Sequence, residues 1–159
     1  KLQIEEALET SRINNLEAFV SYQPRYNILD RSIENETIPF CKDKTVAITT
    51  YSPLMGGLLT GKYESEKEAP AESRFRDYPD FKERYMTDKN MVAMKKLKKI
   101  SEKADLTLTQ MSVGWLLGNA NITSIILGAR NADQLEDNIN NIPEQLSTSV
   151  ISQIDQATI

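Results

Sequence analysis

The sequence predicts an α/β fold built from parallel βαβ units. Three short segments, at residues 18–22, 45–51 and 122–127, are predicted strands because they are apolar or β-branched and are bounded by turn residues. Helical patterns lie between and after them, and strands that alternate with helices are typical of parallel sheets. The 159 residues, 40% of them apolar, suffice for one domain with a hydrophobic core, so we treat residues 1–159 as a single unit.

Two helices and one long excursion are predicted in the first part of the chain. Residues 2–15 have the spacing of an amphipathic helix, and residues 32–42 have a weaker helical pattern that Pro39 interrupts. Residues 62–88 are polar and contain two prolines, which predicts a segment that is mobile or only partly helical. The side chains predicted to face inward from the first helix are Ile4, Ala7, Leu8 and Ser11.

The second part of the chain contains four predicted helices. Residues 89–104 form a basic amphipathic pattern, whose lysines are either a solvated helix face or an anion site. Thr107 and Gln110 have the spacing of a capping box, a further helix opens at Asn131, and Ser147 caps the last helix. The predicted inward side chains are Met91, Met94, Leu97, Ile100, Ala104, Leu135, Ile139, Ile142, Val150, Ile151 and Ile154.

The composition excludes several kinds of chemistry. The chain has no histidine and one cysteine, Cys41, which rules out histidine-dependent catalysis, a histidine or multi-cysteine zinc site and an internal disulfide. A net charge of −4 gives no general attraction to nucleic acid or to an anionic membrane, and no apolar run approaches the length of a membrane span. Cys41 is more simply a partly buried thiol beside Phe40 than a catalytic group, and a single cysteine suits the reducing cytoplasm.

Ligands of parallel α/β folds bind at the carboxyl ends of the strands, so three segments are candidate ligand sites. These are residues 23–27, 51–61 and 128–138. In the first of them, the Gln23 amide can bind a carboxamide through both a donor and an acceptor. Gln23 could equally be a polar group that caps the end of a strand.

The second segment combines an aromatic ring with a glycine turn. Tyr51 ends the predicted strand, and its ring can stack on a planar heterocycle. Ser52 offers a hydroxyl, and the turn from Leu54 through Gly56 and Gly57 offers backbone amides that a phosphate can approach closely. The same pattern also occurs in turns that bind nothing.

The third segment pairs a glycine with a helix amino terminus. Gly128 follows the strand, and the helix that opens at Asn131 can bind an anion through its free amides. Arg130 adds a guanidinium that suits a phosphate monoester, although it could also be a plain surface charge beside a helix cap. Further along this helix lie polar side chains that could contact an adenine: Gln134, Asp137 and Asn138.

Taken together, these segments resemble the aldo-keto reductase superfamily, and most closely its prokaryotic and channel-subunit-like branch. Four strings carry the resemblance, in the family's order and spacing, and they cover nearly the whole chain. The strings are SYQPRYNILDR at 21–31, IPFCKDK at 38–44, YSPLMGGLLTGKY at 51–63 and GWLLGNANITSIILGARNADQLEDNI at 114–139. The resemblance implies a partial TIM (β/α)8 barrel, approximately strands six to eight with their helices, since a whole barrel needs roughly 250 residues.

The resemblance also implies a nicotinamide dinucleotide cofactor. Tyr51 would stack on the nicotinamide, and Gln23 would hold its carboxamide. Ser52, Leu54 and Gly56 would lie along the pyrophosphate, Gly128, Ala129, Arg130 and Gln134 would approach the 2′-phosphate, and Asp137 and Asn138 would approach the adenine and ribose. Where many members carry Lys-Ser after the last strand, this chain has Gly128-Ala129. Arg130 still implies NADPH, while the lost lysine leaves NADH open.

The catalytic residues of the family are missing from this chain. The family uses an aspartate, a tyrosine acid, a lysine and a histidine, all from the first half of its barrel. This chain has no histidine, and Tyr22, Tyr26 and Tyr51 do not match the catalytic tyrosine. The resemblance therefore implies an oxidoreductase that reduces aldehydes and ketones, to which this chain contributes cofactor binding but no catalytic residue.

Three hypotheses follow for the role of the chain. We favour a truncated or processed part of an active reductase, whose full-length form takes a small carbonyl substrate. A non-catalytic nucleotide-binding or regulatory module is the second hypothesis. The third is a half-barrel that pairs with another copy, because three strands leave exposed edges. The sequence does not identify the substrate, and it predicts no nucleic-acid or membrane partner.

Overall fold

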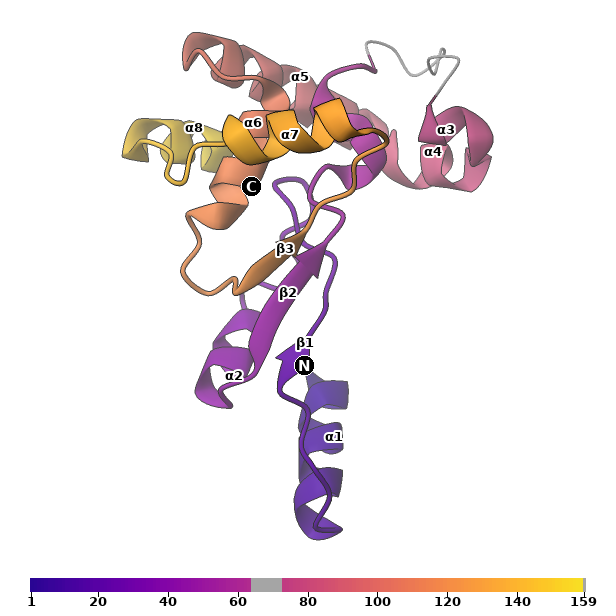
Figure 1. The fold of residues 1–159 in the computed structure, drawn as a ribbon, viewed down its shortest axis with the longest axis vertical. Helices are drawn as coiled ribbons and strands as arrows, with labels where there is room; N and C mark the ends of the chain where they lie inside the picture. Colours follow the sequence, from indigo (N-terminus) through magenta and orange to yellow (C-terminus); the bar gives the residue numbers. More distant parts are fainter. Residues whose placement is uncertain (64–72, 159) are drawn as a thin grey trace.

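A computed structural model describes residues 1–63 and 73–158 and shows helices arranged around a small parallel sheet (Figure 1). The strands are β1 (Ser21–Tyr22), β2 (Ala47–Tyr51) and β3 (Ser124–Ile126), in the spatial order β1-β2-β3. Both strand pairs are parallel. The α/β fold and the parallel pairing expected from the alternation of strands and helices are therefore confirmed.

Helices account for most of the remaining described residues. In Figure 1, α3 to α8 gather beyond the carboxyl ends of the strands, and α1 extends from the opposite end of the sheet. In the described part of the chain, no helix is long and apolar enough to cross a membrane. The helices are α1 (Leu2–Ile13), α2 (Thr37–Asp43), α3 (Arg74–Asp77), α4 (Pro79–Tyr85), α5 (Asp88–Lys103), α6 (Leu108–Leu117), α7 (Ala132–Asn140) and α8 (Thr148–Thr158), with a 3-10 segment η1 (Met55–Thr60).

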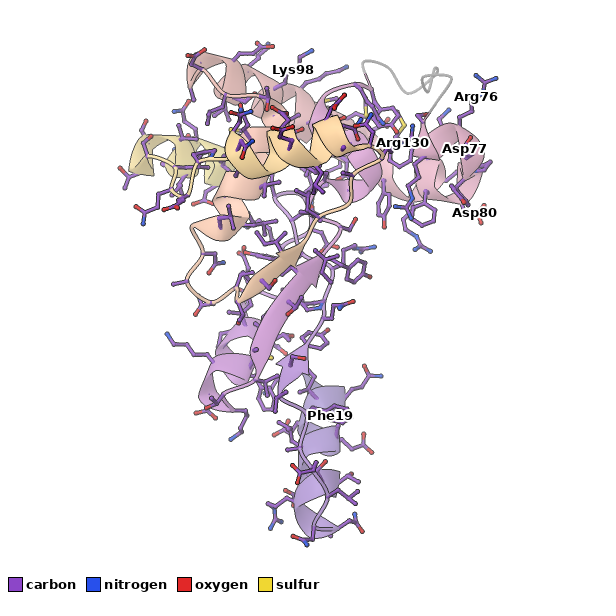
Figure 2. All side chains as sticks on the ribbon, in the orientation of Figure 1. Phe19, Arg76, Asp77, Asp80, Lys98 and Arg130 are labelled. Carbon is purple, nitrogen blue, oxygen red and sulfur yellow. The ribbon has the colours of Figure 1, made fainter. Side chains whose placement is uncertain are left out.

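The first strand is shorter than its sequence predicts. Phe19 and Val20, expected inside a strand at 18–22, are 62% and 77% exposed and precede β1. A strand forms only where a neighbour satisfies its backbone groups, and among the described residues β1 pairs with β2 alone. Figure 2 shows Phe19 at the outer end of the sheet, beside α1.

The second helix begins later than predicted, and Pro39 does not interrupt it. The expected helix at 32–42 is a series of turns up to Glu36, followed by α2. Pro39 lies in the first turn of α2, where a backbone N–H needs no partner within the helix, so the missing donor has no cost. The proline therefore sits at the start of this helix rather than at a break.

The caps and most inward faces follow the sequence. Thr107 accepts from the Gln110 amide at 3.1 Å, and the Gln110 side chain accepts from the Thr107 amide at 2.8 Å, which confirms the capping box of α6. The core lies between the sheet, η1, α5 and α6. Buried core side chains from these elements include Ile48, Leu58, Leu59, Met91, Met94, Leu97, Met111 and Leu116.

Helix α7 departs from the predicted burial. Leu135, expected to face inward, is 46% exposed, and every α7 side chain that the structure describes is exposed. The side chain of Ile139 lies outside the described part, and Ile142 is half-buried. The amphipathic pattern of α7 correctly predicts a helix, but the predicted burial of Leu135 is wrong.

The excursion at 62–88 is partly helical, as predicted. Residues 64–72 lie outside the described residues, and α3 and α4 follow them. Phe75 and Tyr85 are 1% and 4% exposed, so the two short helices are packed on the core. Figure 2 shows Arg76, Asp77 and Asp80 on the side of α3 and α4 that faces away from the rest of the chain.

In the described part of the chain, helices cover one face of the sheet. Along β2, Ile48 and Thr50 are buried, whereas Thr49 is half-buried and Tyr51 is exposed. Neighbouring strand residues point to opposite faces, so the first pair faces the helices and the second pair faces the open side. This one-sided cover leaves the end of β2 accessible.

Candidate functional site

The carboxyl ends of the three strands open at the same edge of the sheet. Tyr51 is opposite Ile126 in β3 and forms a parallel bridge with Arg25, just beyond β1. The Tyr51 amide donates to the Pro24 carbonyl at 3.0 Å. The predicted ligand segments, at 23–27, 51–61 and 128–138, therefore begin side by side.

Tyr51 and Gln23 lie at this edge with accessible side chains. Tyr51 is 42% exposed, and Gln23 is exposed immediately after β1. An exposed ring at a strand end can stack on a flat heterocycle, and an accessible amide beside it can bind a carboxamide. The structure thus brings together the two residues predicted to contact the nicotinamide, at an open surface rather than in a closed pocket.

The turn after β2 has an uncommon backbone. Ser52, Gly56 and Gly57 have φ values of 59°, 68° and 101°, in the left-handed region that glycine adopts most readily. The amides of Met55 and Gly57 donate within the turn, to Ser52 at 3.1 Å and Leu54 at 2.9 Å. Those two amides are already engaged, so a phosphate here would use the other predicted donors, which are the Leu54 and Gly56 amides and the Ser52 hydroxyl.

Asn27 holds this turn in place, and sequence reasoning did not single it out. Asn27 is fully buried, and its side-chain amide donates to the Ser52 carbonyl at 3.0 Å. Its side-chain oxygen accepts from the amides of Leu29 and Asp30, both at 3.0 Å. One side chain thus ties the loop after β1 to the turn after β2. The sequence signal for this role is weak, because it consists of an asparagine between the apolar residues Tyr26 and Ile28.

Lys62 is a second residue that sequence reasoning missed. A Cβ placed on Gly57 would lie 3.4 Å from the Lys62 ammonium nitrogen, so this cation folds back over the glycine turn. Burial, and then the positive charge of Arg130, lower the pKa of Lys62. The loops after β2 and β3 are therefore close enough for their cations to interact, and an anion between them would relieve that repulsion.

The segment after β3 forms a capped helix start. The Asn131 side chain accepts from the Gln134 amide at 2.9 Å, and the Gln134 side chain accepts from the Arg130 amide at 3.1 Å. A Cβ on Gly128 would meet nothing within 4 Å, which leaves room for a ligand beside it. Figure 2 shows Arg130 where this loop meets α7, near the turn after β2.

The remaining predicted residues lie around these groups without forming a closed site. Ala129 is exposed beside Arg130, and Leu54 is half-buried against the core. Asp137 accepts from the Asn141 side chain at 2.7 Å, one turn further along α7. The side chain of Asn138 is outside the described part of the chain.

Burial bears on two alternatives left open by the sequence. Cys41 is completely buried in α2, rather than partly buried as expected, and burial raises the pKa of its thiol, which disfavours the reactive thiolate. In the basic helix α5, Lys95, Lys96, Lys99 and Lys103 are exposed while Lys98 is half-buried. These exposures favour the solvated helix face over the anion site.

Gly56 and Gly128 are expected to respond differently to alanine. Gly56→Ala should lower the free energy of unfolding by about 2 kcal/mol, because φ is positive and the new methyl would lie 2.9 Å from the Phe75 ring. Gly128→Ala should change it by less than about 0.5 kcal/mol. Urea unfolding of the two variants measures both, and equal losses would contradict the strain assigned to Gly56.

Comparisons with known proteins identify the relatives of this chain. Residues 3–159 match the Aldo/keto reductase family. A probable voltage-gated potassium channel subunit beta from Arabidopsis thaliana is 31% identical over 97% of this chain and 48% of its own length. The corresponding protein from Oryza sativa subsp. japonica is 33% identical, over 86% of this chain and 42% of its own length.

A bacterial enzyme is similar to the same extent. L-glyceraldehyde 3-phosphate reductase from Escherichia coli K12 is 31% identical over 85% of this chain and 40% of its own length. The chain thus spans less than half the length of these curated relatives.

Proposed function

Because the chain belongs to the aldo/keto reductase family, we propose that it forms the cofactor-binding part of an NADPH-dependent oxidoreductase that reduces aldehydes or ketones to alcohols. The observation that carries this proposal is the convergence of the three strand ends, with the exposed Tyr51 at one position and the Lys62 ammonium folded over the Gly57 turn at another. Members of the family bind a nicotinamide dinucleotide, and these groups suit its aromatic and phosphate ends.

The residues present fit such a cofactor chemically. Lys62 lies over the Gly57 turn and close enough to Arg130 for the two charges to interact. Two cations at one edge of a chain with net charge −4 make a local site for phosphate in a protein without a general attraction for anions. The open space beside Gly128 supports close approach of a ligand.

Each predicted residue then has a physical role. Tyr51 would provide a flat surface for the nicotinamide, and Gln23 would fix the orientation of its carboxamide. Ser52 and Gly56, with Leu54 between them, would border the pyrophosphate, and Lys62 would neutralise it. Gly128, Ala129, Arg130 and Gln134 would surround the 2′-phosphate, and Asp137 and Asn138 would be nearest the adenosine. The bound cofactor supplies hydride, and no residue of this chain is assigned as its proton donor.

We assign the sheet to approximately strands six, seven and eight of a TIM barrel. In such a barrel one face of every strand packs on helices, and the other faces the barrel interior. The buried Ile48 and Thr50 suit the first face, and Thr49 and Tyr51 suit the second. On this assignment, the chain acts as one unit, and the catalytic aspartate, tyrosine, lysine and histidine belong to the other strands of the full-length protein.

Arg130 is expected to determine the preference for NADPH over NADH. Arg130→Met should weaken NADPH binding about 10- to 100-fold, which corresponds to one lost charged hydrogen bond, and leave NADH binding nearly unchanged. Titration of cofactor fluorescence in the full-length protein measures both affinities. Lys96→Met, which removes an exposed cation from α5, is the matched control and should bind NADPH as tightly as the unsubstituted protein. Absence of saturable binding of either cofactor would refute the proposed function.

A regulatory module is the second candidate. The two plant relatives are probable potassium-channel β-subunits, and a protein of that kind could bind the cofactor without a reductase role.

Pairing of two half-barrels is a further alternative, which size-exclusion chromatography tests: a compact monomer would exclude it. A cytoplasmic location remains a prediction from cysteine use.

A further inference from the structure

Arg25 joins the loop after β1 to the short helix α4. Its guanidinium donates to the Asp30 carboxylate at 2.5 Å and to the Tyr85 hydroxyl at 3.4 Å. The guanidinium carbon also lies 5.6 Å from the centre of the Tyr85 ring. Sixty residues separate Arg25 from Tyr85, so this contact fixes two distant segments relative to each other.

Tyr85 belongs to an aromatic cluster that supports the glycine turn. The cluster consists of Tyr63, Phe75, Phe81 and Tyr85. The Tyr63 and Phe75 rings stack with centres 4.6 Å apart, and Tyr85 meets Phe75 at 6.2 Å and Phe81 at 5.6 Å. A Cβ on Gly56 would be 2.9 Å from Phe75 and 3.4 Å from Tyr85. The cluster is therefore in direct contact with the backbone of the turn.

The connection runs from the proposed nicotinamide end of the ligand to the proposed position of its pyrophosphate. Arg25 is two residues beyond Gln23 and bridges to Tyr51 through the backbone. Through Tyr85, the same side chain secures the aromatic cluster under Gly56. The outer sides of α3 and α4 carry charged groups such as Arg76, Asp77 and Asp80 (Figure 2), so the inner aromatic side is the one that docks.

We propose that Arg25 is a positioning residue that clamps α4 to the β1 loop, and that this clamp limits how fast the cofactor leaves. The inference rests on the proposed function. With Arg25 in place, the Gly56 turn is supported by a fixed aromatic surface, and the side chains beside Tyr51 and the turn keep their relative positions. Without it, α4 opens more often and the turn loses its support, although no group assigned to the cofactor is removed.

Substitution of Arg25 tests the clamp by two measurements on the full-length protein. Arg25→Met should speed hydrogen exchange at the α4 amides and raise the NADPH dissociation rate about tenfold, as expected for a lost charged hydrogen bond. Arg25→Lys keeps the charge beside Asp30 but cannot reach both partners, so both quantities should lie in between. Tyr85→Phe keeps the ring and should have a smaller effect than Arg25→Met.

Arg12→Met is the matched control. Arg12 also pairs with a carboxylate, that of Glu9 at 2.5 Å, but on the exposed surface of α1, and neither measurement should change. Unaltered α4 exchange in Arg25→Met, or faster exchange with an unaltered dissociation rate, would overturn the inference while NADPH binding itself persists. Failure of the unsubstituted protein to bind NADPH or NADH contradicts the proposed function instead, and the inference about release falls with it.

Discussion

The 159-residue chain by itself is expected to leave carbonyl compounds unreduced when NADPH is supplied. Its turnover should be at least about 1,000-fold below the roughly 10 per second typical of enzymes. The chain has no histidine, the resemblance matches none of Tyr22, Tyr26 and Tyr51 to the proton donor of the family, and Tyr51 lies at an open surface. The measurement is NADPH oxidation in the presence of a reactive aldehyde.

Two controls separate loss of chemistry from loss of binding. A complete aldo-keto reductase under the same conditions shows that the aldehyde is reactive. Cofactor fluorescence with the 159-residue chain shows whether NADPH is bound while no product forms. Turnover on the order of 1 per second or more by the chain alone would show that the proton donor is within it. The assignment of the catalytic residues to other strands of the full-length protein would then be wrong.

Asn27→Ala is expected to lower the free energy of unfolding by about 3 kcal/mol. The substitution removes three hydrogen bonds from a fully buried side chain. The Leu29 amide loses this partner, whereas the Ser52 carbonyl still accepts from the Met55 amide and the Asp30 amide still donates to the Asn27 carbonyl. Each lost hydrogen bond is worth about 1 kcal/mol. Urea denaturation, with the change in midpoint at constant slope, measures the loss.

The matched control for Asn27 is Asn14→Ala. The Asn14 side chain also donates to a backbone carbonyl, that of Thr10 at 2.8 Å, but on the exposed end of α1, so its loss should cost less than about 0.5 kcal/mol. Asn27→Asp keeps the acceptor for the two amides but cannot donate to Ser52, and its stability should be intermediate. Similar losses for the Asn14 and Asn27 variants would show that the turn after β2 is held by other contacts.

The parts of the fold that depend on local sequence are the ones that the sequence predicts. The capping box of α6 and the apolar spacing of α5 depend on residues within a few positions of one another, and both are confirmed. The length of β1 depends on a neighbouring strand, and the exposure of Leu135 depends on what covers α7, so no local pattern predicts either. Arg31 donates to Asp155 at 2.6 Å across 124 residues, and no local signal indicates such a pair.

The residues of the candidate site also differ in whether their roles depend on local sequence or on contacts between distant segments. Tyr51, Gly56 and Gly128 follow predicted strands, and the general rule that ligands bind at the carboxyl ends of parallel strands is enough to select them as candidates. Asn27 and Arg25 act by joining segments that are distant in the sequence, so their roles depend on the tertiary fold. Lys62 does carry a local signal, because it is a lysine directly after the glycine that ends the turn, but sequence reasoning did not use it.

Because helices cover one face of the sheet, the other face is open to water. This exposure determines the strength of ionic contacts at the edge formed by the strand ends. Tyr51 and Arg130 are both exposed, so an ionic contact here is formed in water, whose high dielectric constant screens it. Opposite charges 4 Å apart are worth about 1 kcal/mol in bulk water and about 4 kcal/mol near a protein surface. Whatever packs against the open face of the sheet would displace that water and strengthen the same contact severalfold. This chain supplies the charged groups, but the dielectric constant around them depends on what packs against the open face.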